Sequence, residues 1–173
     1  IPDAGLEVRR LAATLLAGFK PEKATPHLVK ALSDSTPEVR IAAAESLGCL
    51  KVGSATKPLS RLMDSPQTME RIRAADALGK LDRPEAASVL MEHMEDRDPA
   101  VRIQVITSLG KLVGLLSEEH RKELNRSLRS SLKSAEAGVC KAAVEALLCG
   151  DEPLAVPDMV SMILDVRREL RYE

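Results

Sequence analysis

The stretch DSTPEVRIAAAESLG, from Asp34 to Gly48, decides the fold of this 173-residue chain because related stretches recur along it. DRDPAVRIQVITSLG, from Asp96 to Gly110, lies 62 residues later, and ERIRAADALGKL, from Glu70, aligns halfway between the two. VRRLAATLLAGF, from Val8, lies 31 residues before the equivalent position, and VCKAAVEALLCG, from Val139, follows the fourth copy after 38. Five copies at a nearly fixed period predict a repeat architecture.

The first part of each copy has the pattern of an amphipathic helix. Val39, Ala43, Leu47 and Leu50 fall on one face of a 3.6-residue period. The equivalent residues are Val8, Ala12, Leu16 and Phe19 in the first copy and Val101, Val105, Leu109 and Leu112 in the fourth. The start is marked by an aspartate three residues before a proline, Asp34 with Pro37 and Asp96 with Pro99, which predicts a turn or cap and a first-turn proline. The recurring glycines near the end, Gly48, Gly79 and Gly110, predict a left-handed stop.

A second helix follows in each copy, with apolar residues at i, i+4 and i+8. The stripes are Ala24, Leu28 and Leu32; Ala55, Leu59 and Met63; Ala86, Leu90 and Met94; Leu124, Leu128 and Leu132; and Ala155, Met159 and Ile163. A single pair of short helices cannot bury its apolar face, whereas stacked pairs form one continuous core. Small residues such as Ala12, Ala43, Ala74 and Ala143 allow neighbouring helices to approach closely. We therefore predict an all-α solenoid of about five stacked antiparallel helix pairs, in one domain over 1–173 with repeats near 3–33, 34–64, 65–95, 96–133 and 134–173.

These repeats resemble HEAT repeats, and most closely the short subclass named after phycobilisome lyases, whose pattern is D-x-x-P-x-V-R-x-x-A-A-x-A-L-G. The third copy departs from that pattern, with Ser65 in place of the aspartate and Glu70 in place of the valine, and the fifth has Cys140 in place of the arginine. The resemblance implies a superhelix whose second helices line a concave surface where partners dock. The subclass name also suggests, as an alternative, a subunit of a bilin lyase or a similar prosthetic-group enzyme.

Composition and motifs argue against several classes of function. Phe19 and Tyr172 are the only aromatic residues and the net charge is −1, so neither a base-stacking platform nor a general phosphate-binding surface is expected. No apolar run approaches the roughly 20 residues that span a bilayer. The three cysteines have no metal-binding or disulfide spacing, which favours a reducing, intracellular and probably cytoplasmic setting as our expectation.

Catalytic signatures are also missing from the sequence. His27, His93 and His120 lie in different repeats, no His-Glu dipeptide of the kind found in HEAT-repeat hydroxylases occurs, and there is no Gly-rich phosphate loop or Cys-His pair. We therefore expect no catalytic residues, no metal and no cofactor.

Two sets of charged residues are candidates for a functional role. Arginines spaced by 31 residues form a row that is either an anion-binding stripe or, as we favour, a ladder of pairs with aspartates at the helix starts. This ladder comprises Asp3, Arg9, Asp34, Arg40, Arg71, Asp96 and Arg102. The second set points outward from the second helices and is either a solvated face or the partner surface: His27, Lys30, Lys57, Arg61, Ser88, Glu92, Arg126, Arg129 and Lys133.

The sequence thus predicts a non-enzymatic scaffold that binds a protein partner along the second helices. Mixed charge suits a protein better than a phosphate backbone, so nucleic-acid binding is the weaker hypothesis. The basic segment EEHRKELNRSLRSSLK, from Glu118 to Lys133, overlaps a seven-residue extension and could contact an acidic partner. The start at Ile1 suggests a processed or excised piece of a longer chain, and the apolar run LAVPDMVSMIL, 154–164, suggests further repeats or pairing with another copy.

Overall fold

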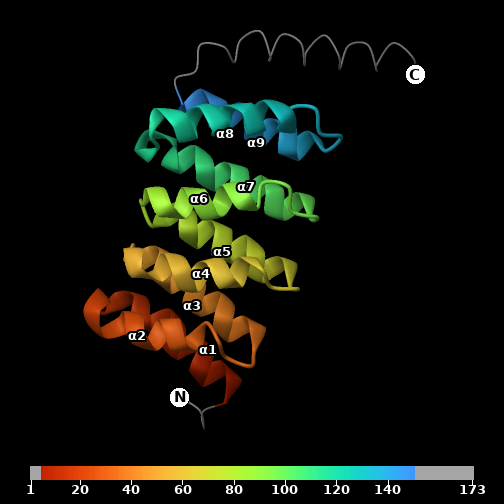
Figure 1. The fold of residues 1–173 in the computed structure, drawn as a ribbon. Helices are drawn as coiled ribbons and strands as arrows, with labels where there is room; N and C mark the ends of the chain where they lie inside the picture. Colours follow the sequence, from red (N-terminus) through yellow and green to blue (C-terminus); the bar gives the residue numbers. More distant parts are fainter. Residues whose placement is uncertain (1–4, 151–173) are drawn as a thin grey trace.

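The structure is a computed structural model that describes residues 5–150 and shows a stack of helix pairs (Figure 1). Within that range there are nine α-helices, three short 3-10 helices and no strand. The α-helices are α1 (Leu6–Leu15), α2 (Pro21–Ala31), α3 (Pro37–Leu50), α4 (Thr56–Met63), α5 (Thr68–Lys80), α6 (Pro84–Glu92), α7 (Pro99–Leu112), α8 (Glu118–Ser131) and α9 (Ala137–Cys149). The 3-10 helices are η1 (Leu16–Gly18), η2 (Gly53–Ala55) and η3 (Val113–Leu115).

The helices form two layers. The first helices of the repeats, α1, α3, α5, α7 and α9, pack side by side, and the second helices, α2, α4, α6 and α8, form a layer over them (Figure 1). Each second helix packs extensively on the first helix of the following repeat, for example α2 on α3 and α8 on α9. The chain is therefore an all-α solenoid, as the sequence predicted, and each repeat completes its core with its neighbour.

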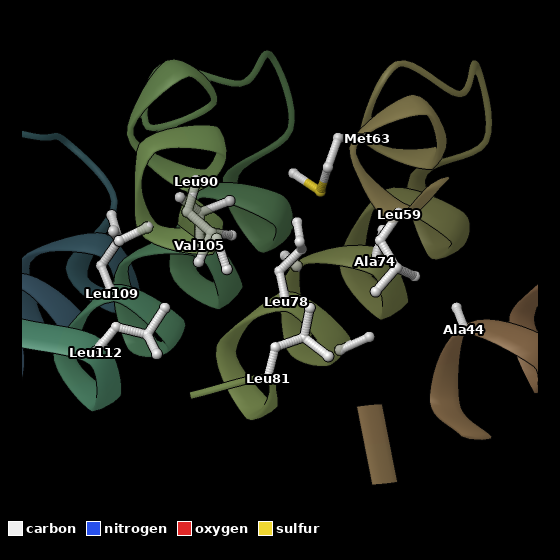
Figure 2. Packing of buried hydrophobic residues seen from close by; sticks show 14 of the residues in the cluster. Ala44, Leu59, Met63, Ala74, Leu78, Leu81, Leu90, Val105, Leu109 and Leu112 are labelled. Carbon is white, nitrogen blue, oxygen red and sulfur yellow. The ribbon is translucent and has the colours of Figure 1, made fainter. Parts of the chain in front are cut away.

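The core lies between the two layers and consists of the predicted stripes. Leu28, Leu59, Leu90 and Leu128 of the second helices are fully buried. Leu90 of α6 and Val105 of α7 meet there (Figure 2). Burying a leucine of this kind contributes roughly 1.5–3 kcal/mol relative to leaving it exposed, and the recurrence of these positions gives each repeat a similar share of the core.

The first repeat is the exception. Val8 and Phe19 occupy core positions of the repeat pattern, but both are exposed, whereas their equivalents Val39 and Leu112 are buried. The prediction that they are core residues was wrong because no first helix precedes α1 in the described part of the chain to cover that side. The fifth stripe of second-helix residues, Ala155, Met159 and Ile163, lies outside the described residues.

The recurring glycines do not end the helices by a left-handed turn. Gly48, Gly79 and Gly110 lie within α3, α5 and α7, and no described glycine has a positive φ. A Cβ atom at Gly79 would lie 2.6 Å from the Cβ of Ser108 in the next first helix. The glycines therefore permit close contact between first helices, and the left-handed residue that ends α3 is Lys51, with φ 52°.

The extra residues of the fourth repeat lengthen its second helix. The α8 helix has 14 residues, compared with 8 in α4 and 9 in α6. The side chain of Ser117 caps its first turn by accepting a hydrogen bond from the backbone amide of His120. The basic segment is therefore an extended helix whose inward residues, Leu124 and Leu128, are buried.

Candidate functional site

The arginine row connects successive repeats. Arg71 donates from Nε to Oδ2 of Asp96 at 2.9 Å and from Nη2 to Oδ1 at 3.0 Å. Its Nη1 donates to the backbone carbonyl of Ser65, in the turn before its own helix, at 2.9 Å. The two side chains are only 4% and 8% exposed. One guanidinium thus fixes the turn of its own repeat and that of the next through charge-assisted hydrogen bonds.

The first link of the row has the same design. Arg9 Nε donates to Oδ2 of Asp34 at 3.0 Å, and Oδ1 of that carboxylate accepts from the backbone amide of Thr36 at 2.9 Å. Burial raises the pKa of Asp34, but the hydrogen bonds from Thr36 and Arg9 outweigh it and place the pKa below its usual value. The pKa of Asp96 is lowered in the same way, against burial, by Arg71 and by the backbone amide of Asp98. Asp3, the remaining aspartate predicted for the ladder, lies outside the described residues.

Two arginines pair with glutamates where the sequence analysis expected aspartates. Arg40 donates to Oε1 of Glu70 from Nε at 3.1 Å and from Nη2 at 2.5 Å, while the Ser65 hydroxyl donates to Oε2 at 2.7 Å. Arg102 Nη2 lies 3.1 Å from Oε2 of Glu136. The two departures of the third copy therefore belong together, because Glu70 supplies the carboxylate that Ser65 lacks.

The fifth repeat uses the same replacement. Ser134 stands where the second and fourth repeats have aspartate, and its hydroxyl donates to Glu136 at 2.5 Å. This hydrogen bond, above all, lowers the pKa of Glu136. A serine at the aspartate position followed within a few residues by a glutamate is the sequence signal that identifies these links, and the sequence analysis missed it.

The row ends at Cys140. Its Sγ donates to the backbone carbonyl of Ser134, six residues earlier, at 3.2 Å. Arg40, Arg71 and Arg102 each donate to the carbonyl six residues earlier in the same way. The thiol therefore retains the local contact of the arginine but has no guanidinium to reach a following repeat. Because the arginines of the row face carboxylates, these contacts favour the structural interpretation over an anion-binding stripe.

The second helices carry a different set of charges. His27, Lys30, Lys57, Arg61, Ser88, Glu92, Arg126 and Lys133 are exposed, and Arg129 is half-buried. Among residues 5–150, apart from Arg129, no side-chain hydrogen bond or ion pair engages these side chains. The α2, α4, α6 and α8 helices that carry them lie next to one another in one layer (Figure 1).

Charges on the first-helix layer are paired with one another. Arg73 lies 3.2 Å from Glu45 of the preceding repeat. Asp76 accepts from Lys80 at 2.6 Å and lies 3.6 Å from Lys111 of the following repeat. The first-helix layer thus satisfies its charges internally, whereas those of the second-helix layer remain available to an external group.

An open groove lies at the N-terminal end of the stack. It has a volume of about 920 Å³, and its walls come from α1, η1, α2 and the turn that leads into α3. Leu15, Leu16 and Phe19 provide apolar surface, and His27 and Lys30 contribute polar groups. This groove was not anticipated from the sequence, although Phe19 was an assigned core residue.

Features of metal or membrane proteins were also sought. Residues 5–150 contain no cluster of three or more His, Cys, Asp or Glu side chains that could hold a metal ion. In the same range, no helix has the length and apolar character needed to cross a bilayer. His27 is on α2, His93 follows α6, and His120 is on α8, so the described histidines come from three different repeats.

The two-layer stack and its repeated Asp-Pro and Arg positions define an α-solenoid of the HEAT type. The sequence matches the family described as HEAT repeats over residues 2–68 and 55–149, and the chain belongs to that family. No curated protein matches it.

Solved structures with a similar fold come from several settings. The complex of CpcE and CpcF of phycocyanin lyase from Nostoc sp. PCC7120 has a TM-score of 0.73 at 22% identity, covering 88% of this chain and 63% of that chain. A designed armadillo repeat protein in complex with the peptide (KR)4 has a TM-score of 0.65 at 19% identity, covering 90% and 83%. An archaeal HEAT-like repeats protein from Thermococcus onnurineus NA1 has a TM-score of 0.52 at 18% identity, covering 87% and 66%. At these identities the likeness establishes the fold alone, and the chain spans less than two thirds of the lyase chain.

Proposed function

We propose that the protein is a non-enzymatic scaffold that binds a protein partner along the layer of second helices, on what would be the concave face of the superhelix. The observation that carries the proposal is the contrast between the layers: the charges of the second helices have no partners among themselves, whereas those of the first helices are paired across repeats. Fixed helices under exposed polar side chains limit the entropy lost on binding.

The order of charges along this layer describes the partner. The α2 and α4 helices present Lys30, Lys57 and Arg61, α6 presents Glu92, and α8 presents Arg126 and Lys133. A complementary partner would offer acidic groups at both ends and a basic group between them. Nucleic acid does not fit this order, because a phosphate backbone carries one sign throughout.

The test compares two variants with the same change in charge. Lys30→Glu with Arg61→Glu reverses charge on the second helices, and Arg10→Glu with Lys141→Glu does so on exposed positions of the first helices. A tagged pull-down from the native host, followed by titration of the purified partner at about 0.15 M salt, reads out the effect. We expect affinity to fall roughly tenfold or more for the first variant and to change little for the second.

The proposal would be overturned if both variants bound the partner equally well or lost it equally. Thermal unfolding of both variants serves as the control, since exposed residues away from special contacts change stability little.

A bilin-lyase subunit is the alternative that the resemblance implies. It rests on fold likeness to the phycocyanin lyase complex, and a shared fold does not carry a shared activity. Added bilin distinguishes the two functions: a lyase subunit would change the absorbance spectrum of the chromophore, and the proposed scaffold would leave it unchanged.

A further inference from the structure

The junctions inside the solenoid are built from very small residues on both sides. In the first-helix layer, Gly48 of α3 faces Ala77 of α5, and Gly79 of α5 faces Ser108 of α7. Gly110 of α7 likewise faces Ala146 of α9, where a Cβ on the glycine would lie 3.2 Å from the alanine Cα. Each first helix therefore offers a glycine to the following repeat and an alanine or serine to the preceding one.

At the two ends of the stack, leucines occupy these positions. Leu15 of α1 is the equivalent of Ala77 and Ser108, and it is 58% exposed. Leu148 of α9 is the equivalent of Gly79 and Gly110, and it is 55% exposed. Both ends thus replace a small junction residue with a large apolar side chain that points away from the stack, and α1 and α9 lie at opposite ends (Figure 1).

The exposed apolar surface is largest around α1. Leu11, on the same side of that helix, is 54% exposed, and Phe19 of the adjoining turn is also exposed. Leu15 and Phe19 line the open groove together with Lys30 of α2. In the internal repeats, the corresponding side of α3 is covered by α2 of the preceding repeat. The groove therefore has the position of a missing second helix.

The sequence beyond α9 contains a segment that matches this position. Residues 151–173 lie outside the described structure, but Ala155, Met159 and Ile163 continue the second-helix stripe of the repeat. The segment 151–165 contains four acidic residues and no basic one, whereas the groove has His27 and Lys30 at its edge. Apolar pattern and charge thus both complement the groove.

We propose that the protein associates head to tail with a second copy of itself. The C-terminal side of α9 and the segment 151–165 of one copy cover α1 and the groove of the next, with Leu148 against Leu15. Two leucines fill the junction where a glycine and a small residue meet inside the chain, so the helices at this contact lie further apart than internal first helices.

The contact is apolar and reversible. Cys140 replaces the ladder arginine in the last described repeat, so no guanidinium of that row reaches across to the next copy. A surface of one kind on one end and of another kind on the other is heterologous, and such association continues to a ring or an open chain unless an end is blocked.

Sedimentation equilibrium and light scattering of the purified chain test the proposal, using Leu15→Glu to block one end and Leu148→Glu to block the other. The wild-type mean mass should rise about twofold or more between roughly 1 μM and 1 mM. Each variant alone should remain a monomer, and an equimolar mixture should form a dimer of one copy of each, because the mixture retains one intact pair of ends.

Leu115→Glu is the matched control, since Leu115 is 46% exposed in η3 and belongs to neither junction; it should associate like the wild type. A wild-type chain that stays monomeric throughout, a Leu148→Glu variant that still associates with itself, or a mixture that stays monomeric would each overturn the proposal. If a glutamate variant unfolds at a lower temperature, Leu15→Gln and Leu148→Gln provide the same test without a charge.

Discussion

The buried carboxylate of Glu70 gives the sharpest test of how this chain maintains its ladder. It is 1% exposed, and its two oxygens serve the Arg40 guanidinium and the Ser65 hydroxyl. In the second and fourth repeats the corresponding pair of positions holds an aspartate and a buried valine, as in Asp34 with Val39. The third repeat should therefore accept the double change Ser65→Asp with Glu70→Val, although each single change is harmful.

The magnitudes follow from the contacts. Glu70→Val removes the acceptor of Arg40, and loss of a hydrogen bond to a charged group costs about 1.5–3 kcal/mol; since Arg40 is one-fifth exposed and partly solvated, we expect about 2 kcal/mol. Ser65→Asp places a second carboxylate beside Oε2 of Glu70, for about 1–2 kcal/mol. The double variant should lie within about 1 kcal/mol of the wild type, which corresponds to a coupling free energy of roughly 2–3 kcal/mol.

Urea and thermal unfolding of the four proteins measure this coupling. A loss of about 2 kcal/mol corresponds to a fall in Tm of roughly 4–8 °C for a chain of this length. Glu70→Gln is the control, since it keeps the length of the side chain and removes only its charge; we expect a smaller loss than for valine. If the double variant is no more stable than Glu70→Val alone, the carboxylate at position 65 does not replace that of Glu70, and the reasoning is refuted.

Three further predictions concern the same framework. The pKa of Asp96 is lowered in the folded state, so its stabilisation is complete above its unfolded pKa of about 3.9 and is lost as the pH falls through the folded pKa; unfolding of Asp96→Asn, followed from pH 7 to pH 2, should show lower stability at neutral pH and a smaller loss in acid. Gly79→Val should lower Tm by roughly 4 °C or more, because its Cβ would meet Ser108 at 2.6 Å, whereas Gly114→Ala, with nothing within 4 Å, should be nearly neutral. Leu109→Asp should abolish cooperative unfolding of several repeats, since it places an unpaired charge in the core; a cooperative melt of unchanged amplitude by circular dichroism would contradict the core assignment.

The helix stripes could be predicted from the sequence because periodicity and burial have the same cause. Leu28, Leu59 and Leu90 recur at 31-residue spacing, and each is fully buried. The spacing does not reveal which repeat lacks a neighbour, so Phe19 was assigned to a core that the described chain does not complete. The role of Gly48 was misread for a similar reason: a glycine near a helix end fits a left-handed stop or a close contact, and only the neighbouring Ala77 distinguishes them.

The candidate binding surface was predictable in its residues but not in its contrast with the opposite layer. Lys57 and Arg61 follow from helical period alone, since they lie away from the stripe of Leu59 and Met63. Ion pairs between residues about 31 apart, such as Lys51 with Asp82 at 2.5 Å, depend on how the repeats stack. That information is in the register between helices, which a stripe on a single helix does not contain.

The departures from the repeat pattern carry more information than the pattern itself. Ser65 and Ser134 lose a carboxylate, and Glu70 and Glu136 return it from a different position, so the link between repeats is kept while its residues change. At Leu15 and Leu148 the change is not compensated within the described chain, and the exposed apolar side chains remain. Because compensation occurs wherever two repeats of this chain meet, the uncompensated leucines mark the surfaces where the partner in the junction belongs to another molecule.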